Sequence, residues 1–141
     1  MTAPLTADEI IARLDLAPHP EGGHYRQTWI AENAGRPTGT CIYFLLKEGE
    51  RSDWHAVDAT EIWHFHTGAP LRLELAGSTA GPASVHTLSG DLRVGAPQII
   101  VPEGHWQRAS STGAFTLVSC TVSPGFQFSG FTLRPDLEIP V

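Results

Sequence analysis

Hydrophobic and polar residues alternate along much of the chain with the period of two that is typical of β-strands. In residues 60–66, Glu61, Trp63 and Phe65 fall on one face of such a strand. Residues 71–75 alternate leucine with charged residues, so these leucines are expected to face a core.

The run at residues 40–46 is apolar on both faces, which predicts a strand that is buried on both sides. The predicted strands cover residues 24–31, 40–46, 52–56, 60–66, 71–75, 84–88, 98–101, 106–109 and 115–122, and an aromatic segment follows at 126–133. Short strands at this spacing, in a chain with 14 Gly and 11 Pro, predict an all-β sandwich or barrel.

One helix is predicted ahead of the strands. Thr6 can cap the amide of Glu9, and Glu9 can reach back to the amide of Thr6, which is the spacing of a capping box. The helix is expected within about residues 6–16 and to end at about Leu14 or Leu16, because Pro18 and Pro20 cannot continue it.

The chain has 141 residues, enough for one domain with a core of its own, so a single domain is predicted over residues 1–141. Nine basic and fifteen acidic residues give a net charge of −6, and no cluster of Lys or Arg is present in the sequence. This balance argues against nucleic acid or an anionic membrane surface as a partner.

The sequence has no apolar stretch near the roughly 20 residues of a membrane span. It also lacks a basic segment followed by an apolar run at its start, so no leader is recognised. A cytoplasmic protein is therefore expected, in which Cys41 and Cys120 are buried, reduced thiols.

Residues 54–68 contain the candidate chemistry. Inside a barrel, a carboxylate on the same strand face as Trp63 and Phe65 is partly desolvated and needs a partner. His55 is the nearest candidate in sequence, and an imidazole acts as a general base or acid near neutral pH with little tuning. A catalytic His55–Glu61 pair is predicted, in which Glu61 holds one tautomer; the alternative is a buried pair that serves packing.

Two groups of residues resemble the motifs of the cupin superfamily. The first motif, HxH…E…G, is approximated by Asp53-x-His55, Glu61 and Gly68. The second motif, G…PxGxxH, is approximated by Gly95 and Pro102-x-Gly104-x-x-Gln107.

Longer phrases resemble the cupin-5 family of largely uncharacterised proteins over about residues 8–133. These phrases lie at residues 19–23, 42–46, 61–65, 101–107 and 117–126. The resemblance implies a double-stranded β-helix, the cupin jelly-roll barrel, at about residues 23–133, with a short N-terminal α-helix. It also implies a homodimer.

Many metal-binding cupins place three His and one Glu at the motif positions. Here these positions hold Asp53, His55, Glu61 and Gln107. One imidazole with two carboxylates suits manganese or magnesium better than zinc or iron. No cofactor is expected, and a divalent metal held by His55, Glu61 and Gln107 is kept as an alternative.

Further residues are predicted to complete a pocket inside the barrel. Gln107 follows a Pro-Gly turn and is expected to donate to a ligand oxygen. Tyr25 or Tyr43 is the candidate acid opposite His55, and burial with a bonded hydroxyl is the competing interpretation for both. The candidate apolar wall consists of Trp63, Phe65 and Trp106.

Charged and imidazole side chains elsewhere are weaker candidates. Arg26 or Arg72 could bind a carboxylate or phosphate, with a solvated strand face as the competing interpretation. His64 and His66 lie on the strand face opposite Glu61 and are interpreted as packing or interface residues. The remaining histidines, interpreted as loop or surface residues, are His19, His24, His86 and His105.

The resemblance extends to metal-independent sugar-nucleotide epimerases of the cupin superfamily, which use a His base and a Tyr acid in such a barrel. The leading hypothesis is therefore an isomerase- or epimerase-type enzyme that moves a proton on a sugar or keto compound. The alternatives are a binding module without chemistry for a small polar metabolite and a metal-dependent cupin of dioxygenase or decarboxylase type.

Overall fold

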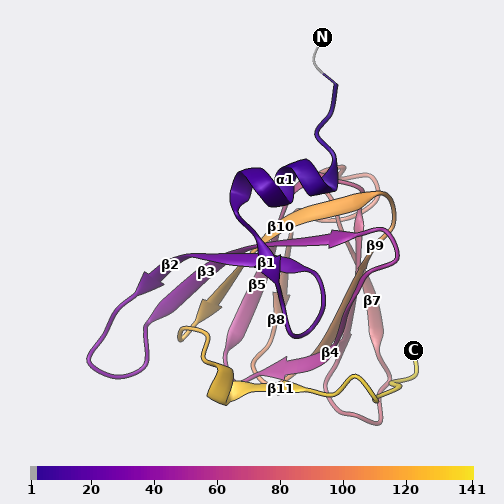
Figure 1. Ribbon diagram of the computed structural model, residues 1–141. Coiled ribbons are helices and arrows are strands. Elements are labelled where there is room, and N and C mark those ends of the chain that lie inside the picture. The colour runs from indigo at the N-terminus through magenta and orange to yellow at the C-terminus, as the bar shows by residue number, and fades with distance from the viewer. Residues whose placement is uncertain (1–2) are drawn as a thin grey trace.

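The computed structural model describes residues 3–141, which form one short helix and two antiparallel sheets (Figure 1). Helix α1 spans Ala7–Leu14. The strands are β1 (Ala17–Pro18), β2 (His24–Ala31), β3 (Gly39–Lys47), β4 (Arg51–Val57), β5 (Thr60–Gly68), β6 (Leu71–Ala76), β7 (Ser84–Leu88), β8 (Gln98–Val101), β9 (Trp106–Ser111), β10 (Phe115–Ser123) and β11 (Phe131–Leu133). A 3₁₀ turn at Phe128–Gly130 precedes β11.

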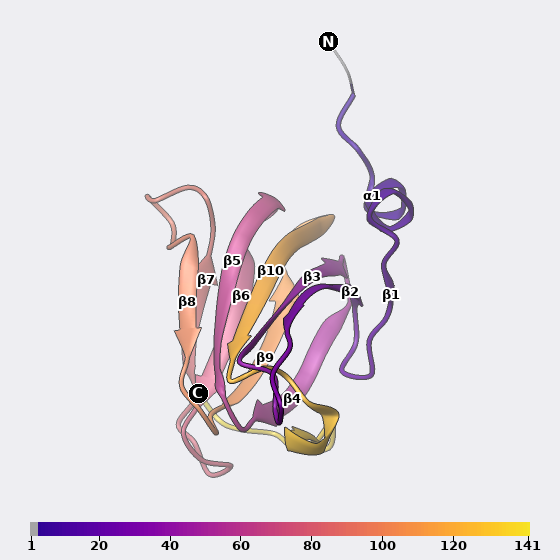
Figure 2. The ribbon, with the colours of Figure 1, turned by 90° about the vertical axis from the view of Figure 1, so that its left-hand side faces the viewer.

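The two sheets face each other as layers, with α1 outside them (Figure 2). One sheet has the strand order β1-β2-β3-β10-β5-β8, and the other has the order β11-β4-β9-β6-β7. Strands distant in sequence are therefore neighbours, as where β10 pairs with both β3 and β5. The all-β prediction with one N-terminal helix is confirmed, and β1 and β11 are additions that the alternation did not indicate.

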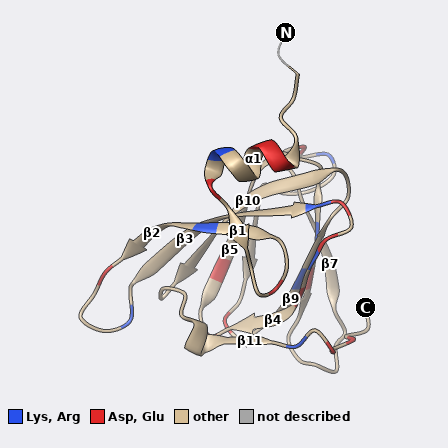
Figure 3. Ribbon diagram, viewed as in Figure 1, with Lys and Arg blue, Asp and Glu red and all other residues tan. Residues whose placement is uncertain are grey.

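The core lies between the two sheets. Leu71 and Leu73 are completely buried, as the alternation of β6 predicted. Glu74 on the other face of β6 is also buried, and its charge is paired because Nε of Arg108 donates to it at 2.7 Å. Within residues 3–141 no helix is long and apolar enough to cross a membrane. Lys and Arg are spread singly over the ribbon rather than gathered on one element (Figure 3).

The capping box of α1 is present: the Thr6 hydroxyl accepts the Glu9 amide at 3.2 Å, and the Glu9 carboxylate accepts the Thr6 amide at 3.2 Å. The helix ends at Leu14, the earlier of the two predicted ends, because Asp15 adopts a left-handed conformation with φ 55°. Ile10 packs on Leu45 and other apolar side chains of the outer sheet face, so α1 closes that face.

The turn that joins β1 to β2 is held tightly against β4. A Cβ on Gly22, whose φ is +109°, would lie 2.1 Å from the carbonyl oxygen of Arg51. The amide of Asp53 also donates to the carbonyl of Glu21 at 2.8 Å. Because only glycine allows this close approach at this φ, the sequence Gly22-Gly23 places Glu21 beside the start of β4.

Candidate functional site

A cavity of about 150 Å³ lies between the sheets. Two histidines and two glutamates contribute to its wall: His19, Glu21, His55 and Glu61. A second set is apolar: Ile42, Val57, Val122, Phe126 and Phe128. Because Val57, Val122 and Phe126 pack together as one cluster, the cavity has a distinct apolar part as well as an ionisable part.

His55 on β4 is 2% exposed and lines the cavity. Its Nδ1 lies 2.7 Å from the carbonyl oxygen of Asp53, and a carbonyl oxygen only accepts. Nδ1 of the neutral ring therefore carries the proton, and Nε2 is left as an unprotonated base. Burial lowers the pKa of His55, although the nearby charge of Glu61 opposes this shift, so the imidazole is neutral at neutral pH.

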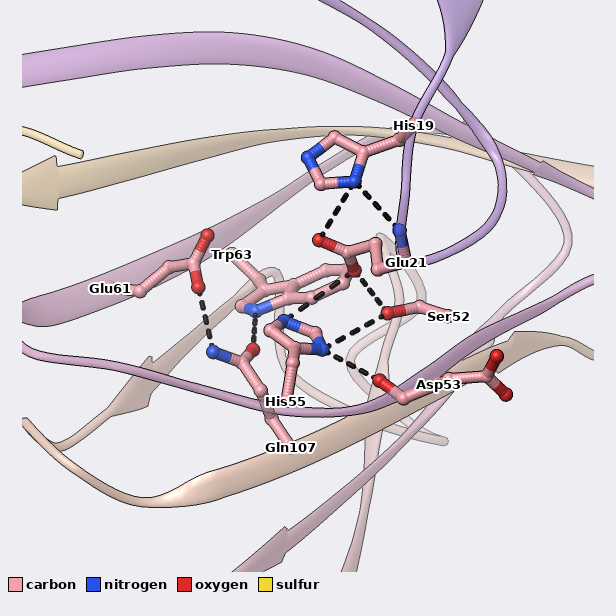
Figure 4. A network of polar contacts seen from close by, with 8 residues as sticks. All are labelled: His19, Glu21, Ser52, Asp53, His55, Glu61, Trp63 and Gln107. Carbon is pink, nitrogen blue, oxygen red and sulfur yellow. Dashed lines mark hydrogen bonds and ion pairs between the residues drawn. The ribbon is translucent and has the colours of Figure 1, made fainter. Parts of the chain in front are cut away.

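Glu21 connects the two imidazoles (Figure 4). Its Oε2 accepts a hydrogen bond from the Ser52 hydroxyl and lies 3.5 Å from Nε2 of His55. Its Oε1 lies 3.4 Å from Nδ1 of His19, and that nitrogen already accepts the Glu21 amide at 3.1 Å. Both ring nitrogens that face Glu21 thus present lone pairs, which favours a proton on the carboxyl group.

The electrostatics agree with this proton assignment. Burial raises the pKa of Glu21 to about 8, with the Ser52 hydrogen bond opposing the shift. Burial also lowers the pKa of His19 to about 4, and the neighbouring His55 adds to the shift. At neutral pH the site therefore holds a neutral carboxylic acid between two neutral imidazoles.

Glu61 on β5 belongs to a second polar chain. Its Oε1 accepts the Gln107 amide at 2.7 Å, and Oε1 of Gln107 accepts the Trp63 indole N–H at 2.8 Å (Figure 4). Burial raises the pKa of Glu61 to about 7, with His55 opposing the shift and Glu21 adding to it. Glu61 therefore influences His55 through its charge.

The prediction that Glu61 is the carboxylate that holds the His55 tautomer is wrong. The carbonyl of Asp53, on the same strand, holds the tautomer, and Glu21 is the carboxyl group that faces Nε2. Gln107 is completely buried and its amide is used by Glu61 and Trp63, so the prediction that it donates to a ligand oxygen is also wrong.

The two tyrosines lie on opposite sides of their sheet. Tyr25 on β2 lines the cavity, with its ring 4.4 Å from that of His19. Tyr43 on β3 packs with the cluster under α1 and is outside the cavity. Arg26 is also outside, because its guanidinium lies 5.9 Å from the Tyr43 ring and donates to the Leu14 carbonyl at 2.7 Å. The site predictions for Tyr43 and Arg26 are therefore wrong.

The predicted apolar wall is wrong as well. Trp63 and Phe65 pack in the main core, and Trp106 packs in a separate cluster around Trp54. The three predicted aromatic residues therefore lie outside the cavity. The aromatic residues that do line the cavity include Phe126 and Phe128, which come from the segment after β10. His64 and His66 bond to Thr121 and Ser119 on the outer sheet face, as the packing interpretation expected.

His19 and Glu21 were not recognised from the sequence as site residues. His19 is 8% exposed, so its interpretation as a loop or surface residue is wrong. The available signal was the phrase at residues 19–23, in which a carboxylate precedes two glycines that permit close backbone approach.

The residues at the four motif positions do not fit the implied metal set. The Asp53 carboxylate faces Nε of Arg51 at 3.1 Å, and the oxygen of Gln107 accepts from Trp63. Within residues 3–141, no three His, Cys, Asp or Glu side chains form a group that could hold a metal ion. The polar groups around His55 are instead joined by hydrogen bonds.

Residues 8–134 match the family Cupin_5, described as Cupin superfamily (DUF985). This chain belongs to that family. The cupin prediction is thereby confirmed. No curated protein matches the chain.

Solved structures support the same fold. Protein SO0799 from Shewanella oneidensis is similar at 38% identity and a TM-score of 0.87, covering 93% of this chain and 85% of that one. A hypothetical protein from Leishmania major is similar at 29% identity and a TM-score of 0.83, covering 92% and 88%. Oxalate decarboxylase from Bacillus subtilis is similar at 14% identity and a TM-score of 0.64, covering 82% of this cupin and 29% of that chain. This last likeness concerns the fold alone and supports the jelly-roll assignment.

Proposed function

We propose that this cupin is an isomerase- or epimerase-type enzyme that moves a proton on a small carbonyl compound bound in the cavity. One observation carries the proposal. The free Nε2 of His55 faces the carboxyl group of Glu21 at 3.5 Å, and both side chains line the same cavity. A neutral base beside a neutral acid is the pair that general acid–base catalysis needs.

The protons balance in such a reaction. Nε2 of His55 takes a proton from the carbon next to the carbonyl group, and Glu21 gives its own proton to the carbonyl oxygen. The guest becomes a neutral enol, while the site becomes an imidazolium–carboxylate pair. Because the net charge of the buried site never changes, no uncompensated charge is created away from water. In the return step the enol hydroxyl gives its proton back to the Glu21 carboxylate, and the His55 imidazolium gives its proton to the same carbon; delivery to the opposite face of the enol gives the epimer. If that carbon carries a hydroxyl, the enol is an enediol: the proton of this hydroxyl passes to Glu21 while the imidazolium protonates the former carbonyl carbon, which gives the isomer.

The surrounding groups support these roles. The Asp53 carbonyl fixes the tautomer before and after proton transfer, because its acceptor geometry requires a proton on Nδ1. Ser52 donates to Oε2 of Glu21 and stabilises the carboxylate once it forms. The nearby charge of Glu61 favours the imidazolium of His55. Tyr25 lines the cavity and is a second donor for the enol oxygen.

Deuterium exchange tests the proposal. The protein is incubated in D₂O with hydroxyacetone or cyclohexanone, and loss of the proton next to the carbonyl is followed by NMR. We expect exchange above the buffer rate, and a fall of about a hundredfold or more in His55→Gln and Glu21→Gln. His86→Gln is the matched control, because His86 does not line the cavity; it should exchange like the wild type.

Exchange that is unchanged in a folded His55→Gln variant would contradict the role of His55. Circular dichroism and the unfolding midpoint establish that the variant is folded, and Glu21→Gln provides an independent variant. Exchange at the buffer rate in the wild type, together with guest binding, would support the alternative of a non-catalytic binding module.

The homodimer and the cytoplasmic location stay predictions from the resemblance and the composition. Analytical ultracentrifugation of the full chain measures the first of them directly.

A further inference from the structure

The cavity contains no positive side chain to receive an anion. None of its lining residues is Lys or Arg. The arginines on the neighbouring strands are turned away: Arg26 donates to the Leu14 carbonyl at 2.7 Å, and Arg51 donates to the Asp53 carboxylate at 3.1 Å. A phosphate or carboxylate in this cavity would lie among the carboxyl oxygens of Glu21 and Glu61, without the charged partner that a buried anion needs.

The polar wall is suited to an uncharged guest. Nε2 of His55 offers a lone pair, and the carboxyl of Glu21 and the hydroxyl of Tyr25 offer donors. A carbonyl or hydroxyl group uses such donors and acceptors without bringing a charge. The apolar part, formed around Val57, Val122 and Phe126, can cover the hydrocarbon end of the same molecule.

The size of the cavity limits the guest further. A volume of about 150 Å³ is close to that of a dry cavity known to hold one benzene molecule. The part of a guest that lies inside the cavity therefore has on the order of seven non-hydrogen atoms. A sugar nucleotide is larger than the cavity and carries phosphates, for which the lining offers no Lys or Arg.

We propose that the cavity selects a small uncharged carbonyl compound with one polar end and one apolar end, and that it rejects anions of the same size. This inference deepens the proposed function, because it names the class of molecule that the same cavity takes.

Three probes of similar size separate the possibilities: cyclohexanone, cyclopentanecarboxylate and cyclohexylamine. Binding to the full chain is measured by isothermal titration calorimetry, with thermal shift as a second readout. We expect cyclohexanone to bind at least about tenfold more tightly than the carboxylate or the amine, because each charged probe loses hydration on entry. Equal or tighter binding of either charged probe would overturn the inference, as would the failure of all three to bind.

A gain of function provides the complementary test. Gln27 is exposed and contributes to the cavity wall, so it can be replaced without disturbing the core. Gln27→Arg supplies the missing cation and should strengthen carboxylate binding at least about fivefold, while the uncharged matched variant Gln27→Met should not. Unchanged carboxylate affinity in a folded Gln27→Arg protein would contradict the charge argument.

Binding is measured here without turnover, so the two proposals fail separately. Selective ketone binding without deuterium exchange would leave this inference standing and refute the proposed reaction. Deuterium exchange in a protein that binds the carboxylate more tightly than the ketone would refute this inference and leave the proposed reaction standing.

Discussion

The protonated state of Glu21 predicts an unusual dependence of stability on pH. A carboxyl group whose pKa rises from 4.5 in the unfolded chain to about 8 in the folded protein binds more protons when folded. The free energy of unfolding must then fall as the pH rises between these values. His19, whose pKa falls from 6.5 to about 4, acts in the opposite sense, and its contribution ends near pH 7.5.

The magnitude follows from these shifts. Between about pH 4.5 and 6.5 the buried histidines oppose the buried glutamates, and the stability curve is expected to be nearly flat. Above pH 6.5 the glutamates contribute up to about 1.4 kcal/mol per pH unit each, while His19 and His55 still oppose the loss by about 0.4 kcal/mol each until their contribution ends near pH 7.5. Glu21 contributes about 2 kcal/mol by pH 8, and Glu61, with a pKa of about 7, adds less than about 1 kcal/mol.

Urea unfolding of wild type and Glu21→Gln, measured every half unit from about pH 6.5 to 8.5, tests this reasoning. We expect a loss of about 2 kcal/mol in the wild type and of less than about 0.5 kcal/mol in Glu21→Gln, where the contributions of Glu61 and of the two histidines nearly cancel. Glu48→Gln is the control, because Glu48 is exposed and should leave the wild-type slope unchanged. The series ends near pH 8.5 because burial also raises the pKa of the Cys120 thiol, which adds a further loss at higher pH.

Stability in the wild type that is constant or rising over this range would refute the assignment of the proton to Glu21. The same slope in Glu21→Gln as in the wild type would show that the titrating group lies elsewhere.

The structure makes three further predictions. Gly22→Ala should lower the free energy of unfolding in urea by about 2–4 kcal/mol, because the added Cβ would lie 2.1 Å from the Arg51 carbonyl oxygen. The control is Gly35→Ala, where an added Cβ meets nothing within 4 Å, and the free energy of unfolding should change by less than about 0.5 kcal/mol. Gln107→Leu should cost about 2–4 kcal/mol by the same assay, since it leaves two buried polar partners unpaired; a neutral result would contradict the role given to this amide. Phe128→Ala should increase the rate of cyclohexanone binding in stopped-flow measurements, because the Phe128 ring lines the cavity. The free energy of unfolding should change by less than about 1 kcal/mol, because this ring is 55% exposed. An unchanged binding rate would mean that the ring does not restrict entry.

The arrangement of the site also explains why it tolerates burial. His55, Glu21 and Glu61 are each less than a tenth exposed, and each makes hydrogen bonds or close polar contacts with groups on other elements or on its own strand. Neutral forms avoid most of the desolvation cost that charged forms would meet. The same neutrality leaves His55 available as a base and Glu21 as an acid, so stability and the proposed chemistry depend on one proton assignment.

The sequence by itself determined the strand pattern and the family. Alternation located the long strands because each buries one face, and Thr6 with Glu9 marked the start of the helix through purely local hydrogen bonds. His55 and Glu61 were also found from sequence, since an ionisable group on an apolar strand face is conspicuous. Such features depend on neighbours within a few residues along the chain.

Only the tertiary structure decided which groups meet. Glu21 is 34 residues away from His55 in sequence and reaches it because the turn at Gly22 and Gly23 packs on β4, a contact that no local pattern encodes. Both tyrosines lie on strands, but the pairing of β2 with β3 and the position of α1 place Tyr25 in the cavity and Tyr43 beneath the helix. Partners across a barrel are set by strand order and register, and these are properties of the whole fold.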